Sequence, residues 1–155
     1  MPESEQQEFV PIPPSLSDTA GFLLNRAGRI IHDNVEKSLA VIKLSTRELG
    51  ILRIVDEGPL TQQALGKKHN IDRTTVVQLI DMLEQRELLT RVANSADRRS
   101  NLLYLTKRGK KTLAQGVRLA EKEQAKFLAP LEDAEWQSLR LSLTKLIAYH
   151  MSQAD

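Results

Sequence analysis

Residues 61–105, TQQALGKKHNIDRTTVVQLIDMLEQRELLTRVANSADRRSNLLYL, decide how this chain folds. Their pattern predicts a helix, a tight turn, a second helix, and two strands joined by a basic loop. The two helices are close enough in sequence to pack against each other, and the strands follow directly. We therefore interpret this stretch as one compact unit and the other segments as its support.

The second helix of the stretch has an apolar side and a polar side. Asp72 is expected to cap it, because a carboxylate accepts hydrogen bonds from the free amides of a first helical turn. Apolar residues recur at three- and four-residue spacing: Val76, Leu79, Ile80 and Leu83. The rest of its first two turns carries Arg73, Thr74, Thr75, Val77 and Gln78. Such side chains suit base edges, although an ordinary solvated face would carry the same types.

The predicted hairpin after this helix carries two arginines at its tip. Strands are expected near 88–92 and 102–105, with a turn from Asn94 and then Asp97-Arg98-Arg99-Ser100. Guanidinium groups suit phosphates and narrow minor grooves, so Arg98 or Arg99 is expected to enter a minor groove. We expect Asp97 to hold one of them through an ion pair. A solvated hairpin tip is the alternative.

Six segments carry a resemblance to a known family: LTQQAL (60–65), IDRTTV (71–76), LIDMLE (79–84), LLTR (88–91), DRRS (97–100) and LYLTKRG (103–109). In them the chain resembles the MarR family of bacterial winged-helix transcription regulators, over roughly residues 16–152. The wing sequence followed by L-T-x-x-G is the most specific part. Val77 and Gln78 depart from the hydroxyl-then-basic pair common in the family, so a base preference does not transfer.

The resemblance implies a mainly α (α+β) fold, a winged helix-turn-helix with long N- and C-terminal dimerisation helices. Residues 16–45 and 112–155 would form the helical dimerisation region. Residues 46–111 would form the DNA-binding region of the same intertwined domain. The implied assembly is a two-fold homodimer whose recognition helices read half-sites about 34 Å apart.

Helices outside the module are predicted from their apolar stripes and caps. The first runs from about Leu16 to Ala40, capped by Ser17 or Asp18, and another opens at Ser45 or Thr46. Thr61 is expected to cap the first helix of the pair, and Thr106 a helix over 106–127. Pro130 ends that helix, and a last one covers 133–151. We expect the first and last helices to pack together and against their copies in a second subunit.

Residues 1–15 are polar and then proline-rich, which predicts an extended or disordered N-terminal arm. The alternative is an arm that crosses onto a partner subunit with Phe9, Val10 and Ile12 as apolar contacts.

Composition excludes several classes of function. The chain has 155 residues, a formal net charge of +2 and no cysteine, so disulfides and thiolate metal sites are impossible. No apolar run is long enough to span a membrane, and we expect a cytoplasmic protein. No nucleophile motif or glycine-rich phosphate loop is present, and the three histidines are scattered. We therefore expect neither an enzyme, nor a cofactor, nor a metal.

The leading hypothesis is a dimeric, sequence-specific DNA-binding regulator, a repressor released from a palindromic operator by a small effector. Phosphate contacts are expected from Lys67, Lys68, Lys107 and Arg108. The family resemblance implies aromatic carboxylate or phenolic effectors, and Arg26, Arg29 and His32 could meet a carboxylate, or instead face solvent or pair with Asp33 and Glu36. The alternative function is a winged-helix protein-interaction module without DNA binding, which the acidic Asp81, Glu84 and Glu87 favour.

Overall fold

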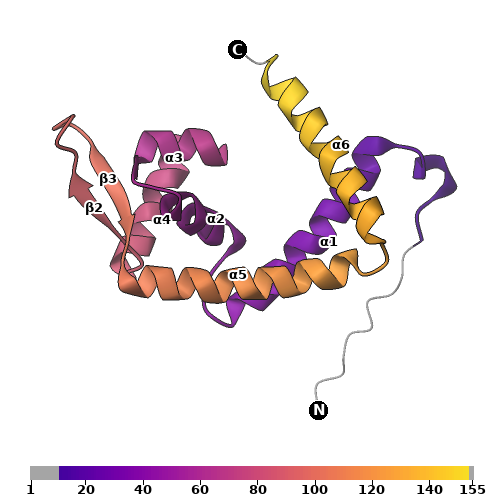
Figure 1. Ribbon diagram of the computed structural model, residues 1–155, viewed down its shortest axis with the longest axis horizontal. Helices are drawn as coiled ribbons and strands as arrows, with labels where there is room; N and C mark the ends of the chain where they lie inside the picture. The colour runs from indigo at the N-terminus through magenta and orange to yellow at the C-terminus, as the bar shows by residue number, and fades with distance from the viewer. Residues whose placement is uncertain (1–10, 154–155) are drawn as a thin grey trace.

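The computed structural model describes residues 11–153 and shows an elongated, mainly helical molecule (Figure 1). Its helices are α1 (Ala20–Ala40), α2 (Thr46–Asp56), α3 (Gln62–His69), α4 (Arg73–Gln85), α5 (Lys107–Leu128) and α6 (Asp133–Met151), after a 3-10 turn η1 (Pro14–Leu16). The strands are β1 (Leu60–Thr61), β2 (Leu89–Ala93) and β3 (Asn101–Leu105). The α+β winged helix-turn-helix with long terminal helices is confirmed.

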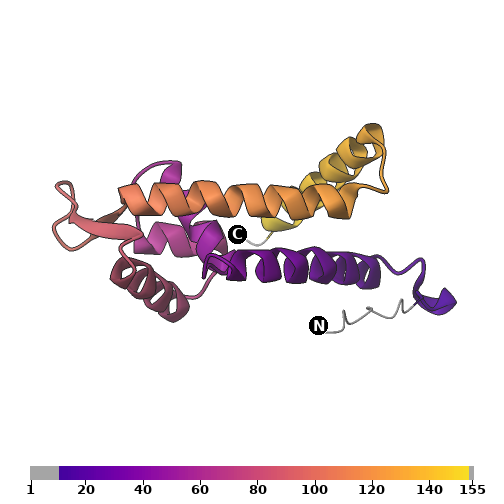
Figure 2. The ribbon, with the colours of Figure 1, turned by 90° about the horizontal axis from the view of Figure 1, so that it is seen from below.

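The winged module gathers at one end of the molecule, while α1 and α5 run side by side away from it (Figure 2). The strands form one antiparallel sheet in the order β1-β3-β2. The predicted hairpin pairs Arg91 with Leu103, which sends both side chains to the face that meets the helices. Sequence analysis missed β1, because two residues are too short to show an alternating pattern.

Side-chain caps begin the helices of the module where the sequence predicts them. Ser45 and Glu48 form a capping box at α2, and Thr61 accepts from the amide of Ala64 at α3. Asp72 and Thr106 cap α4 and α5. Asn70 ends α3 with φ of 53°, the left-handed conformation that makes the turn into α4 tight.

The N-terminal boundary of α1 differs from the prediction. The helix begins at Ala20, with Thr19 at its N-cap and no capping bond from that side chain. Pro14 instead starts a 3-10 turn, and Ser17, a predicted cap, donates its hydroxyl proton to the carbonyl of Pro14. Of the predicted arm, residues 1–10 with Phe9 and Val10 lie outside the described residues, and Ile12 is exposed.

The apolar core lies within the winged module and its junction with α1 and α5. It contains Leu39, Leu44, Leu49, Ile51, Leu52, Val55, Leu65, Val76, Ile80, Leu83, Leu88, Leu89, Leu103 and Leu113. No described residue of α6 is buried, and Leu146 and Ile147 are 52% and 59% exposed. The packing of the first and last helices together and against their copies in a second subunit stays a prediction, since the single chain buries no described residue of α6. No helix within residues 11–153 is long and apolar enough to cross a membrane.

Candidate nucleic-acid interface

The amino-terminal half of α4 presents a short polar surface. Its apolar residue Val76 is buried in the core, which orients the opposite side outward. Arg73, Thr74 and Gln78 are exposed, whereas Thr75 and Val77 are half-buried on the flanks. Asp72 anchors the start of the helix, because its Oδ1 accepts the Thr75 amide proton at 3.0 Å. Three of the five predicted base-reading residues therefore face solvent together.

Asp72 should make the stability of the protein depend on acid pH. Hydrogen bonds from the Thr75 hydroxyl and amide hold the pKa of the Asp72 carboxyl below its ordinary value. The contribution of the charged cap is therefore present above about pH 4 and is lost as the pH falls through the lowered pKa. We expect the difference in Tm between wild type and Asp72→Asn to shrink on acidification from about pH 6 to about pH 3. A Tm difference that is constant with pH would contradict this role.

The hairpin tip, residues 94–100, is ordered by its own hydrogen bonds. The Asn94 amide donates to the Ser100 carbonyl at 3.1 Å, and the Asn94 side chain accepts from the amide of Ala96 at 3.0 Å. Asp97 Oδ1 accepts the backbone N–H of Arg99 at 3.0 Å. The predicted ion pair from Asp97 to Arg98 or Arg99 is therefore wrong: within residues 11–153 the carboxylate shapes the backbone instead. Arg98 and Arg99 are both exposed.

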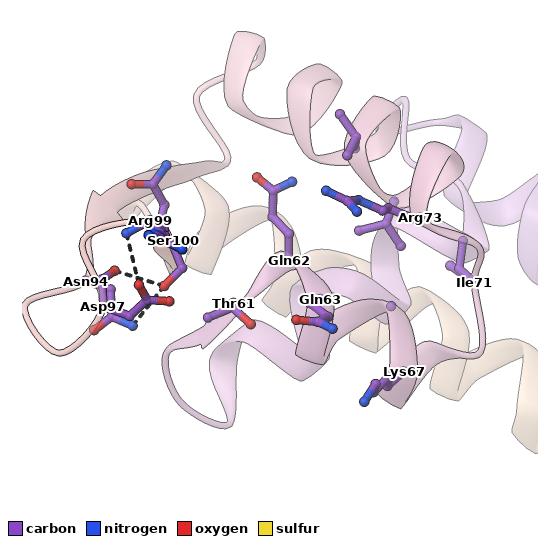
Figure 3. Close-up of a pocket in the computed structure, with 14 residues that line it drawn as sticks. Thr61, Gln62, Gln63, Lys67, Ile71, Arg73, Asn94, Asp97, Arg99 and Ser100 are labelled. Carbon is purple, nitrogen blue, oxygen red and sulfur yellow. Dashed lines mark hydrogen bonds between the residues drawn. The ribbon is translucent and has the colours of Figure 1, made fainter.

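A cleft of about 640 Å³, here called the basic cleft, lies between α3, the start of α4 and the hairpin tip (Figure 3). Lys67 comes from α3, Arg73 from α4 and Arg99 from the tip, so each element contributes one cation. Figure 3 shows Arg73 and Gln62 extending into the space between α4 and the tip. The arrangement is suited to hold a polyanionic strand along the cleft while the tip reaches beyond it.

Sequence reasoning missed several polar residues of the basic cleft. They are Thr61, Gln62, Gln63, Asn94, Ser100 and Asn101. Thr61 was assigned only as a helix cap, yet a cap position brings the free amides of the first turn to the same surface. That signal could have identified the start of α3 as part of the site.

Comparisons with known proteins agree with this geometry. The MarR family model matches residues 44–100. The putative transcriptional regulatory protein for the hcr operon of Thauera aromatica is 28% identical over 123 residues, 78% of this chain and 74% of that protein. A MarR-family regulator from Rhodococcus sp. RHA1 superposes with a TM-score of 0.79 at 25% identity, over 86% of this chain and 96% of the other. The chain is therefore similar to MarR-family regulators, and the family model covers its winged module.

The repressor CouR is a further structural neighbour of this chain. CouR bound to a 23-mer DNA duplex is 28% identical, with a TM-score of 0.78 over 90% of this chain and 99% of CouR. CouR from Rhodococcus jostii RHA1 bound to p-coumaroyl-CoA is 26% identical, with a TM-score of 0.77 over 86% of this chain and 95% of CouR. The resemblance inferred from the sequence motifs is confirmed, and the chain is a transcriptional regulator rather than a member of an enzyme family.

The predicted phosphate-contacting residues of this regulator fall into two groups. Lys67 lines the basic cleft together with Arg73 and Arg99. Lys68, Lys107 and Arg108 do not line it. Lys68 Nζ pairs with Glu57 at 3.0 Å and Arg108 pairs with Glu87 at 3.3 Å, both at the surface, and Lys107 is exposed. Exposed pairs of this kind are weak and exchange readily, so Lys68 and Arg108 stay available to a phosphate.

The acidic residues that favoured a protein-interaction module are engaged inside the regulator. Arg91 pairs with both Asp81 and Glu84, and Glu87 pairs with Arg108. The carboxylates of α4 therefore neutralise cations of the same module and do not form an acidic docking surface. This arrangement and the comparisons favour the DNA-binding regulator over the alternative.

The three effector candidates lie along α1 of the regulator. His32 Nε2 is 3.0 Å from the Thr46 hydroxyl, and its Nδ1 is 3.3 Å from Asp33 Oδ1. The pairing of His32 with Asp33, one of the alternatives for this residue, is therefore confirmed. Arg26 lies over the ring of Phe22 at 5.9 Å, and Arg29 is exposed. The basic cleft and a second hollow between α2 and α5 are both lined by other residues.

Within residues 11–153, no group of three or more His, Asp or Glu side chains could hold a metal ion. His69 packs its buried Nε2 against α2, where a Cβ added at Gly50 would lie 2.1 Å from that atom. A side chain larger than that of glycine at position 50 would therefore require the His69 ring to move.

Proposed function

We propose that this MarR-family regulator acts in the cytoplasm as a homodimeric repressor that binds a palindromic operator through the basic cleft and the hairpin tip. One observation carries the proposal: cations from three separate elements, Lys67, Arg73 and Arg99, line one cleft beside the exposed polar start of α4. CouR, which shares the fold at 28% identity, is a repressor bound to a DNA duplex. The proposed activity needs neither catalysis nor a cofactor.

Each part of the surface has a distinct role in this proposal. Arg73, Thr74 and Gln78 read base edges in the major groove, with Thr75 and Val77 at the flanks of the contact. Gln suits adenine and Arg suits guanine, because each can form two hydrogen bonds to that base. Arg98 and Arg99 reach into the flanking minor groove, and Asp97 orders the loop that carries them. Phosphate contacts come from Lys67, Lys68, Lys107 and Arg108.

The proposed dimer explains the exposed apolar side chains of α6. Leu139, Leu141, Leu146, Ile147, Tyr149 and Met151 are each at least 41% exposed in the single chain. A soluble monomer rarely leaves so many large apolar side chains of one helix in water, so burial against the terminal helices of a second copy is favourable. A two-fold axis would then place the two α4 helices roughly 34 Å apart, which is one turn of DNA.

The test of the proposed function is salt-dependent binding of the wild-type protein to duplexes from the region upstream of its own gene. Fluorescence anisotropy should show saturable binding at low salt and a steep loss of affinity as salt rises. The expected slope of log K against log salt is about −0.9 for each phosphate that the protein neutralises. Sedimentation should show a dimer on each duplex. An affinity for every duplex that hardly responds to salt, or no binding at all, would refute the proposal.

For release from DNA we propose a small aromatic carboxylate or phenolic effector held near Arg26, Arg29 and His32 of α1. His32 bonds to Thr46, the first residue of α2, so an anion that drew His32 away would loosen the join between α1 and the module. CouR is bound to p-coumaroyl-CoA, which shows an aromatic acyl ligand on a related fold. Titration of aromatic acids into the DNA complex should release the duplex. Release that is undiminished in His32→Ala would rule out the role of His32.

A further inference from the structure

We propose that Arg91 is the positioning residue that holds the hairpin at a fixed angle to the recognition helix α4, and so aims the arginines of the tip at DNA. The inference rests on the proposed DNA binding and goes beyond it by assigning a role to a residue that does not line the basic cleft. It concerns how the wing is oriented, not which groups touch the duplex.

The guanidinium of Arg91 joins three elements of the module. Nη1 donates to Glu84 and Nη2 donates to Asp81, both on α4. Nε donates to Gln62 Oε1, on the first turn of α3, at 2.8 Å. The backbone N–H of Arg91 also donates to Glu84 Oε1 at 3.1 Å, so side chain and strand are held to the same helix. All three side-chain nitrogens of Arg91 are therefore engaged.

The site is sheltered enough for these bonds to matter. The Arg91 side chain is 19% exposed, in contrast to 65% for Arg108, whose ion pair lies at the surface. Burial alone would lower the pKa of Arg91, but hydrogen bonds to Asp81 and Glu84 outweigh that effect and hold the pKa above its ordinary value. A guanidinium offers donors from three nitrogens in fixed directions, whereas lysine carries all of its donors on one nitrogen.

The position of Arg91 along β2 makes it an effective anchor. It lies on the strand that leads to the tip, seven residues before Arg98, and a strand advances about 3.3 Å per residue. A small change of angle at Arg91 therefore moves the tip by several ångströms, on the order of the length of a hydrogen bond. Within residues 11–153, no hairpin residue other than Arg91 forms an ion pair with α4.

Arg91 also changes the charge that α4 presents. Asp81 and Glu84 lie on the second half of the helix whose first half meets DNA in the proposed complex. Without Arg91, two unpaired carboxylates would stand close to the phosphates, and like charges repel. The same side chain thus orients the hairpin and offsets one of the two negative charges of the helix beside it.

The decisive experiment is a double-mutant cycle between Arg91→Met and Arg98→Ala, read as affinity for an operator duplex that includes the flanking minor grooves. In the wild-type background Arg98→Ala should weaken binding about 10-fold. Arg91→Met should also weaken binding about 10-fold. Adding Arg98→Ala to the Arg91→Met variant should then lower the affinity by less than about a further 2-fold. This loss of additivity is expected if the tip is no longer aimed, and a merely structural role would not produce it.

Arg86→Met is the matched control. Arg86 Nη1 pairs with the buried Glu48 at 2.8 Å and joins the carboxyl end of α4 to α2, away from the hairpin tip. Its replacement should lower Tm yet leave the full 10-fold effect of Arg98→Ala. If Arg91→Met does not fold, Arg91→Lys replaces it in the cycle, because lysine keeps the charge but loses the fixed donor geometry of the guanidinium. In the Arg91→Lys background, the loss of affinity caused by Arg98→Ala should then fall from about 10-fold to about 5-fold or less.

Two failures are distinguishable. An Arg98→Ala effect that is undiminished in the Arg91 variants would overturn the positioning role while leaving DNA binding intact. Absence of binding by the wild-type protein to any duplex at low salt would instead refute the proposed function.

Discussion

Replacing Arg98 and Arg99 together with alanine should lower operator affinity by about 100-fold or more. Both side chains are exposed at a tip whose backbone is held by Asp97 and Asn94, so the substitutions remove DNA-binding groups without disturbing the loop. A hydrogen bond to a charged group contributes about 1.5–3 kcal/mol, and a dimer would lose up to four such arginines. A 100-fold loss of affinity is about 2.7 kcal/mol, which is well below the sum for four such bonds. We expect this smaller value because exposed side chains are mobile and lose freedom on binding. Fluorescence anisotropy at fixed salt measures the change.

The salt dependence separates this effect from a general loss of charge. The slope of log K against log salt should become shallower by about 0.9 for each phosphate that the variant no longer neutralises. The control variant Lys37→Ala with Lys122→Ala removes two exposed cations from α1 and α5, outside the winged module, and should bind almost as the wild type does. Equal reductions of affinity in the two double variants would mean that the tip has no special role.

Replacing Gly109 with alanine should lower the free energy of unfolding by about 3 kcal/mol, the upper end of what overpacking usually costs. A Cβ at this position would lie 1.8 Å from the backbone oxygen of Leu88. That oxygen cannot move aside easily, because the Thr106 amide donates to it at 3.2 Å and the Thr106 hydroxyl donates to the Glu87 carbonyl at 2.6 Å. Urea denaturation followed by circular dichroism measures the change in stability.

Gly28→Ala is the matched control for this prediction. A Cβ at Gly28, in the middle of α1, would meet nothing within 4 Å in the chain. Alanine there should be neutral or should stabilise the helix by up to about 1 kcal/mol. Alanine is thus expected to lower the free energy of unfolding at position 109 and to leave it unchanged or raise it at position 28. A Gly109→Ala variant as stable as the wild type would show that α5 can shift away from Leu88.

The L-T-x-x-G motif has a physical explanation in the packing around Gly109. Thr106 caps α5 by accepting the Gly109 amide proton at 2.9 Å, and Gly109 lets that first turn lie directly against Leu88. The motif therefore fixes the join between the hairpin and α5, and it does not touch the basic cleft. Its specificity as a sequence signal comes from a packing requirement of the fold.

The sequence by itself determined the elements of the module and their order. Ser45, Thr61, Asp72 and Thr106 were identified as caps because capping depends on residues three positions apart, which a sequence displays directly. The exposed face of α4 followed from the spacing of its apolar residues for the same reason. Where the local signal was ambiguous, as between Pro14 and Thr19, the predicted start of α1 was wrong.

Only the tertiary structure decided which side chains act together. Lys67, Arg73 and Arg99 meet around one cleft, and Arg91 finds Gln62, Asp81 and Glu84, through packing between residues up to 32 positions apart. Asp97 was expected to bind a neighbouring arginine and binds a backbone amide instead, because the turn geometry brings that amide closer. Local patterns specify helices and caps, whereas the partner of a long charged side chain depends on how distant elements pack.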